Sequence, residues 1–539
     1  MKKLNKYFLF VFILIILKQV LMSHIPIIAL TIAGCDDQLM VKLAANILQM
    51  NYLGVYDCLT FVKGISFPLF LSVNTALGIS YINAITILYS ISVFLFVESI
   101  KKLLPKEWMK YVLFAVLLFN PIMYSQEVVQ RVYRNSLIPS QVLLIFSSFF
   151  SLYLNRKERN KKILPWSILG GLSLLFFYNT REDSIWIIPF VLTCTIILIV
   201  NNIIVKKNYK KIIIFLLPLL FLIIGNIGIK CMNYIHYGTY VRIDEENSAF
   251  SNAMKTIYSV KDEKNQKWVS VSRDKINKLY EVSPTLNNIQ RDLDYYMDTY
   301  AIIDRTVDNE VEDGWFWWSF RFAVQESGYY ETPKKAEDFY NNVTKEINNA
   351  IKDGKLEKIP TMPSALMSPW KKGYGLKLLD TINKEIIYTN SFKELKLSLV
   401  ESDGIDRNIS YFESLTNDQA IYPTTENNLE ANIHKKKVLN VYIGKLNIIS
   451  NIYRIVPILS IVAIISYIVL TIKLIKNKTL IDKWLIVTSI LLSYIVLLIG
   501  VGYNHISSCH SITYMYLCAT YPLILMFDML NIMFIKIKK

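Results

Sequence analysis

Long apolar runs alternate with short polar stretches over most of the chain. They cover residues 7–33, 66–100, 111–125, 136–154, 163–179, 185–205, 212–230, 452–472, 484–503 and 511–535. A helix needs about 20 apolar residues to cross the hydrocarbon of a bilayer. In that hydrocarbon only helices and closed barrels satisfy their own backbone. The pattern therefore predicts an all-α polytopic membrane protein with about 10 to 11 transmembrane helices. Pro68 and Gly78 interrupt the run 66–100, which favours a short tucked helix near 68–77 followed by one crossing.

Hydropathy drops between about 231 and 450, where most acidic residues lie. Ser283-Pro284 and Thr332-Pro333 each offer an N-cap with proline in the first helical position. This segment is long enough to bury a core of its own, so we expect an α-rich exterior domain. The predicted parts are a transmembrane module at 1–230 with a first exterior loop at 34–65, the exterior domain at 231–450, and C-terminal transmembrane helices at 451–539.

Composition agrees with a membrane protein. The 539 residues are 53% hydrophobic and only 19% charged, which excludes an ordinary soluble enzyme and a disordered chain. The formal net charge of +16 raises the question of nucleic acid. However, the basic residues cluster beside the apolar segments, so they indicate topology and we expect no nucleic-acid partner. The clusters are Lys2, Lys3 and Lys6; Lys101, Lys102, Lys106 and Lys110; Arg156, Lys157, Arg159, Lys161 and Lys162; Lys206, Lys207, Lys210 and Lys211; Lys473, Lys476, Lys478 and Lys483; and Lys536, Lys538 and Lys539.

If each apolar segment crosses once, all of these clusters face one side, which the positive-inside rule identifies as the cytoplasm. Both termini are then cytoplasmic, and residues 231–450 are exterior. The N-terminus resembles a signal peptide but has no cleavage site, so we interpret it as an uncleaved first span. Cys35 and Cys58 share the first exterior loop, and two free thiols are favoured over a disulfide.

The first exterior loop carries Asp36 and Asp37 just before an amphipathic stretch, residues 39–50, that fits an interfacial helix. Two interpretations are open. The carboxylates can cap the helix and oppose its dipole. Alternatively, they can take a proton from an acceptor hydroxyl or hold a divalent cation such as Mg²⁺ or Mn²⁺.

Four cations lie at exterior ends of predicted spans, where positive charge is scarce: Lys63, Arg131, Arg134 and Arg181. A lipid-linked phosphate would explain them, because guanidinium and ammonium groups bind phosphate. The alternatives are snorkelling of Lys63 and pairing of Arg181 with Glu182 or Asp183. Asp57, Glu182 and Trp315 are candidates for binding a sugar or an acceptor.

Trp315 opens an aromatic run that continues through Phe316, Trp317 and Trp318. Such a run can stack on sugars, although core packing or a membrane-interface belt is more typical of it. His505, Cys509 and His510 suggest zinc only weakly, because they offer three ligands at irregular spacing and no fourth.

Short motifs resemble the GT-C superfamily of integral membrane glycosyltransferases. The resemblance rests on an Asp-Asp pair in the first exterior loop, a juxtamembrane helix, Phe67-Pro68-Leu69-Phe70 at the second span, and an exterior Arg-Glu before an apolar span. An uncharacterised bacterial group of such proteins is more similar, through the runs Asp36-Asp37-Gln38-Leu39, Tyr56-Asp57, Leu59-Thr60, Lys63-Gly64, Pro68-Leu69-Phe70-Leu71, Thr180-Arg181-Glu182-Asp183-Ser184-Ile185-Trp186, Val282-Ser283-Pro284 and Asp313-Gly314-Trp315-Phe316.

This resemblance implies a GT-C-like fold, a polyprenyl-phosphate sugar donor, and a catalytic base or metal ligand at Asp36 or Asp37. One feature departs from the family pattern, because many of its members carry the large exterior domain after the last span. From the resemblance we predict a bacterial cell-membrane glycosyltransferase that acts on an exterior glycan, lipid or protein acceptor. Membrane lipids are further expected partners. The alternatives are a lipid-linked oligosaccharide polymerase or ligase, and a non-enzymatic transporter or flippase, in which internal repeats are common but none is visible here.

Overall fold

The computed structural model describes residues 6–205, 211–264, 266–304, 309–360, 367–393, 395–426 and 428–535. Within these ranges the chain is helical and holds only isolated β-bridges, which confirms the predicted all-α class. Several predicted cytoplasmic basic residues lie outside the described residues: Lys2, Lys3, Lys206, Lys207, Lys210, Lys536, Lys538 and Lys539.

Among the described residues, 6 helical stretches are long and apolar enough to cross a membrane. They are Tyr81–Leu103, Arg134–Leu154, Glu182–Ile203, Ile212–Tyr237, Asn432–Lys476 and Lys478–Ser507. The chain is thus compatible with a multi-pass membrane protein. Other predicted spans form shorter helices, such as α1 (Lys6–Met22) and α5 (Glu107–Leu118). The larger number of crossings stays a prediction.

The N-terminal part of the chain combines short helices with long apolar ones. Its further helices are α2 (Asp37–Leu48), α3 (Ser66–Ala76), α4 (Tyr81–Ile100), α6 (Ile138–Leu154), α7 (Asn160–Tyr178), α8 (Ile188–Val200) and α9 (Ile212–Tyr237). The expected tucked helix is α3, and Gly78, at φ +67°, turns the chain into α4. Glycines let α7 and α9 approach closely, since a Cβ on Gly171 would lie 2.8 Å from Phe221.

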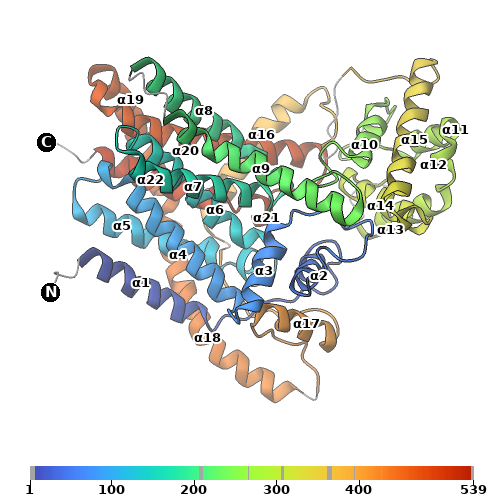
Figure 1. Cartoon of the computed structure of the whole chain (residues 1–539). Coiled ribbons are helices and arrows are strands. Elements are labelled where there is room, and N and C mark those ends of the chain that lie inside the picture. Colours follow the sequence, from blue (N-terminus) through green and yellow to red (C-terminus); the bar gives the residue numbers. More distant parts are fainter. Residues whose placement is uncertain are drawn as a thin grey trace.

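A separate helical unit, within the segment predicted to be exterior, builds a core of its own, and Figure 1 places it beside the long apolar helices. Its helices are α10 (Ala249–Ser259), α11 (Arg273–Val282), α12 (Pro284–Asn287), α13 (Gln290–Asp304), α14 (Asp313–Glu326) and α15 (Pro333–Lys352). Both predicted helix starts are present. Ser283 caps α12 and Thr332 caps α15 through side-chain bonds to backbone N–H groups, each with proline next in the chain.

The rest of the segment predicted as one exterior domain joins the core of the apolar helices instead. It forms α16 (Tyr374–Ser391), α17 (Asp406–Thr416) and α18 (Leu429–Ile452), which precede α19 (Val456–Lys476), α20 (Ile481–Ser507), α21 (Tyr514–Leu517) and α22 (Thr520–Ile535). Ile409, Phe412 and Leu415 recur at helical spacing on α17 and are buried against this core. Residues 231–450 therefore contribute to two cores, and α9 extends past the boundary at 230.

Polar contacts fix α17 near the start of the chain, although it lies hundreds of residues later. Asp403 accepts a 2.5 Å hydrogen bond from the backbone N–H of Thr31. Asp418 accepts hydrogen bonds from the Ser80 hydroxyl (2.7 Å) and from the Ile82 N–H (2.9 Å) at the start of α4. These anchors hold α17 beside α2 and α3 (Figure 1).

Candidate functional site

The two adjacent aspartates of the first exterior loop lie at the N-terminus of α2, as the sequence predicts. Asp36 occupies the N-cap position, but its side chain makes no capping hydrogen bond. Each carboxylate instead contacts a cation from another segment. Side-chain capping therefore does not account for this pair.

Asp36 lies where three loops meet. Its Oδ1 accepts hydrogen bonds from Lys63 Nζ at 2.9 Å and from the Tyr133 hydroxyl at 2.8 Å. The side chain is 36% exposed, and no described residue hydrogen-bonds to Oδ2. Burial opposes the charge of this carboxyl, but Lys63 and the Tyr133 hydrogen bond outweigh burial and hold its pKa well below the usual range. Asp36 thus presents one free oxygen of an ionised carboxylate.

Asp37 differs from its neighbour because its side chain is completely buried. Arg131 binds both of its oxygens, through Nε at 3.1 Å and Nη2 at 2.5 Å. A bidentate guanidinium pair of this kind is strong and geometrically specific. Asp37 therefore has no oxygen available to a ligand.

Tyr133 links Asp36 to a second ion pair. Arg134 Nε donates to the Tyr133 hydroxyl at 3.1 Å, and Lys63 Nζ lies 3.4 Å from the same oxygen. Arg134 Nη1 then contacts Glu182 Oε1 at 2.5 Å. The chain therefore brings Asp36, Lys63, Tyr133, Arg134 and Glu182 into one network of balanced charge.

The backbone next to Lys63 packs against the end of α7. A Cβ on Gly64 would lie 2.1 Å from the carbonyl oxygen of Asn179. The same carbonyl accepts a 3.0 Å hydrogen bond from the Ser66 N–H. Only glycine permits this approach, so Gly64 fixes where Lys63 can lie relative to Asp36.

Arg181 makes a separate cluster. It binds Asp183 through Nε at 2.9 Å and Nη2 at 2.6 Å, and its Nη1 donates to Asn135 at 2.8 Å and to the Met515 carbonyl. Its guanidinium lies 5.2 Å from the Tyr516 ring centroid. Of the two acidic partners considered from sequence, Arg181 pairs with Asp183, while Glu182 turns to Arg134.

Two predicted sugar-binding residues lie apart from the network. Asp57 pairs with Lys42 at 2.9 Å and accepts the Leu59 N–H in a turn. Trp315 stacks on Tyr300, with ring centroids 4.7 Å apart. The nearer aromatic residue is Trp318, whose ring centroid is 5.7 Å from Lys63 Nζ.

Sequence reasoning gave Tyr133 no role, and from the aromatic run it singled out Trp315 and not Trp318. Tyr133 lies between Arg131 and Arg134, and a tyrosine inside such a pair is the one available signal for its bridging role. Trp318 lies on the part of α14 that faces the first exterior loop. Its neighbour Trp317 packs into the exterior core, so the aromatic run serves packing and the site together.

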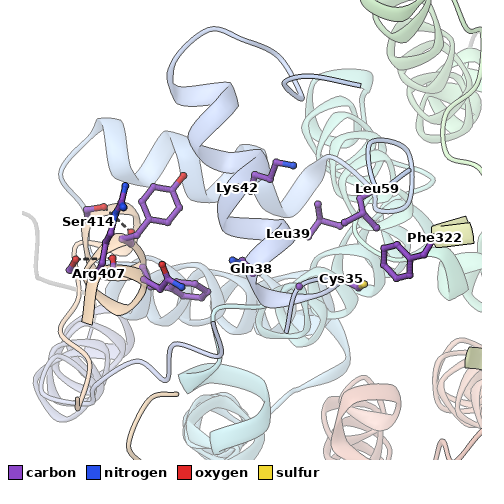
Figure 2. Close-up of a pocket in the computed structure, with 13 residues that line it drawn as sticks. Cys35, Gln38, Leu39, Lys42, Leu59, Phe322, Arg407 and Ser414 are labelled. Atoms are coloured by element: carbon purple, nitrogen blue, oxygen red, sulfur yellow. Dashed lines mark hydrogen bonds between the residues drawn. The ribbon is translucent and has the colours of Figure 1, made fainter. Parts of the chain in front are cut away.

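A cavity of about 860 Å³ opens beside this network (Figure 2). Cys35 and Gln38, which flank the aspartate pair, line it together with Phe322 of α14 and Arg407 and Tyr411 of α17. Trp318 and Phe322 stack with centroids 6.1 Å apart, so the aromatic surface continues from Lys63 into the cavity.

Each carboxylate of the aspartate pair faces a different cation, and the described residues contain no group of three or more His, Cys, Asp or Glu side chains that could hold a metal ion. A divalent cation at Asp36 or Asp37 stays a prediction. Cys35 and Cys58 are free thiols.

Comparison with known proteins identifies no relative: no family model, no curated protein and no solved structure matches the chain. The resemblance drawn from short motifs thus stays a prediction.

Proposed function

We propose that the protein is a membrane glycosyltransferase of GT-C type that moves a sugar from a polyprenyl-phosphate donor to an exterior acceptor. The observation that carries this proposal is the state of Asp36, which is ionised and partly exposed. An ionised carboxylate with one unbonded, partly exposed oxygen suits proton abstraction. It lies among cations at the N-terminus of α2, and its neighbours Cys35 and Gln38 line a cavity large enough for a ligand.

The reaction needs one base and one leaving group. An acceptor hydroxyl oxygen attacks the anomeric carbon of the donor and forms the new glycosidic bond. The bond from that carbon to the phosphate oxygen breaks, and polyprenyl phosphate leaves with the electron pair. The hydroxyl proton passes to Asp36. Direct attack without a carboxylate nucleophile inverts the anomeric configuration.

Lys63 gives the site a means to bind donor phosphate. Its Nζ lies 2.9 Å from Asp36 Oδ1. A phosphate that takes Lys63 as its partner removes the main cause of the low pKa of Asp36, so the carboxylate becomes a stronger base when the donor is bound. Arg134, next in the network, would stabilise the charge that develops on the leaving phosphate.

Arg131 and Arg181 have a smaller part in this proposal than the sequence alone gives them. Arg131 is committed to Asp37, and Arg181 to Asp183, Asn135 and a backbone carbonyl. Both brace the loops that carry Tyr133, Arg134 and Glu182. We place phosphate binding on Lys63 and Arg134.

The apolar helices support a multi-pass membrane protein. We propose that the membrane is the bacterial cell membrane, with the Asp36 network and α10–α15 on the exterior face and both termini in the cytoplasm, as the positions of the lysine and arginine clusters indicate.

The proposal is tested with the full chain in nanodiscs, given a labelled polyprenyl-phosphate sugar and a bacterial envelope extract. We expect release of polyprenyl phosphate together with transfer of label to the extract. If labelled lipid instead moves across proteoliposomes with its sugar bond intact, the protein is a flippase and the proposal is wrong. The exposed variant Asp353→Asn serves as a control for handling of mutants.

A further inference from the structure

The cavity beside Asp36 has the surface of a carbohydrate site. The Phe322 and Tyr411 rings supply apolar faces, and Gln38, Asn408 and Ser410 supply amides and a hydroxyl. Aromatic faces pack on the C–H faces of sugar rings, while amides and hydroxyls bond to sugar hydroxyl groups. Its volume of about 860 Å³ falls in the range of pockets that enclose small ligands.

The charge of this cavity is one-sided. Lys42 and Arg407 line it, and none of the described lining residues is an aspartate or a glutamate. Lys42 shares its charge with Asp57, but the Arg407 guanidinium has no ion-pair or hydrogen-bond partner within the described ranges. A guanidinium left open in a concave site favours a carboxylate or phosphate group on the ligand, which it can bind in two-point fashion.

The two ends of the cavity differ in character. Figure 2 shows Phe322 and Cys35 toward one end and Arg407 with Ser414 toward the other, with Gln38 and Lys42 between them. The Phe322 end adjoins Trp318 and Lys63, and hence Asp36. A ligand that extends along the cavity would present one end to the network and its acidic group to Arg407.

The cationic end is held in place by the fold. A Cβ on Gly404, at φ +96°, would collide with Thr31, so the turn before α17 lies directly against the segment that leads into α2. Asp403 and Asp418 anchor α17 on both sides of Arg407. The position of the backbone that carries Arg407, relative to α2, is thus set by the scaffold and not by a free loop.

We propose that this cavity is the acceptor subsite and that the acceptor is an acidic glycan, a sugar chain whose phosphate or carboxylate group binds Arg407. The identification as acceptor rests on the proposed glycosyltransferase function, whereas the selectivity for an acidic glycan rests on the cavity itself.

Binding can be measured without any donor, with the full chain in nanodiscs of uncharged lipid. The probes are tetragalacturonic acid, its fully methyl-esterified neutral form, and a short glycerol phosphate oligomer. We expect wild type to prefer an acidic probe over the neutral one, and Arg407→Gln to weaken that acidic probe roughly 10- to 100-fold, as for a lost charge-assisted contact. Lys355→Gln, an exposed cation after α15, should bind like wild type.

Two further readouts test the role of the site in binding and in turnover. Tyr411→Ala should weaken acidic and neutral probes alike. With a donor and an acceptor extract, Arg407→Gln should raise the acceptor KM and leave kcat unchanged.

The proposal is overturned if wild type binds neutral and acidic probes equally, if Arg407→Gln binds the acidic probes like wild type, or if vesicles of anionic lipid displace the probes completely, which would make the ligand a lipid headgroup. Arg407-dependent binding of the acidic probes without any donor turnover would refute the glycosyltransferase and retain the acidic-glycan site.

Discussion

At the scale of single residues, the adjacent Asp36 and Asp37 have opposite roles. Asp36 keeps one oxygen free, whereas Asp37 is enclosed and bound at both oxygens by Arg131. Sequence alone treats the two residues alike, because their partners come from other loops, Lys63 and Tyr133 for Asp36 and Arg131 for Asp37. The structure separates a partly exposed carboxylate from a fully enclosed one.

Asp37→Asn should lower the free energy of unfolding by roughly 3 kcal/mol, since it replaces the buried carboxylate with an amide and leaves the largely covered Arg131 only its longer, 3.5 Å contact to Glu127 as an ion pair. Turnover per folded molecule should remain. Thermal unfolding of the purified protein measures the first quantity, and Asp353→Asn, an exposed aspartate after α15, is the control. Equal melting temperatures for the two variants would contradict the role given to Asp37.

Lys63→Gln should change the pH dependence of turnover. In wild type the pKa of Asp36 lies below its usual value, so the carboxylate is charged throughout the neutral and mildly acidic range. Without Lys63 the effect of burial is less opposed and the pKa rises, so the base becomes protonated at higher pH. We expect the acid limb of kcat/KM for the donor, which reports the pKa of the free enzyme, to move to higher pH. An unchanged acid limb would mean that Asp36 is not the titrating base.

From the sequence, the residues that belong to the site can be predicted better than the pairs that they form. Charge in an unexpected place identifies Asp36, Lys63, Arg134 and Glu182, which do come together. The partners cannot be predicted, because they depend on which loops meet in space. Arg181 illustrates this, since it chooses Asp183 and a distant backbone carbonyl.

At the scale of elements, Gly64 controls the contact between the first exterior loop and α7. Gly64→Ala places a Cβ where the Asn179 carbonyl lies, so the loop has to shift and carry Lys63 away from Asp36. We expect a loss of about 1 to 3 kcal/mol in stability, and a fall in turnover on the order of 100-fold from misplacement of the site.

Gly375→Ala on α16 is the matched control, because no atom lies within 4 Å of its Cβ position. Wild-type turnover by Gly64→Ala would show that the position of Lys63 does not matter for the reaction.

Local signals predict individual helices well and their grouping poorly. The prolines after Ser283 and Thr332 mark real helix starts, and Pro68 with Gly78 marks the division between α3 and α4. The polar segment 231–450 nevertheless divides between two cores. Amphipathic helices such as α17 bury one face wherever a partner is found, and composition does not reveal that partner.

At the scale of the whole molecule, the proposed function requires α10–α15 to lie on the exterior side of the membrane. A reporter fused after Lys162 should be cytoplasmic and one fused after Lys355 exterior, because short loops rich in lysine and arginine stay inside. Protease protection and reporter activity in intact cells give the result. A cytoplasmic Lys355 would place α10–α15 on the side opposite to the one the account requires.

The measurement that tests the central claim most directly compares Asp36→Asn with wild type, Asp37→Asn and Asp353→Asn in turnover of a polyprenyl-phosphate sugar. Asparagine keeps the size of the side chain and removes its basicity. The account predicts a loss of roughly 100- to 10,000-fold for Asp36→Asn, with donor binding and melting temperature retained, and near wild-type turnover per folded molecule for the other two. Wild-type turnover by Asp36→Asn would contradict the assignment of Asp36 as the base and remove the observation on which the proposed function rests.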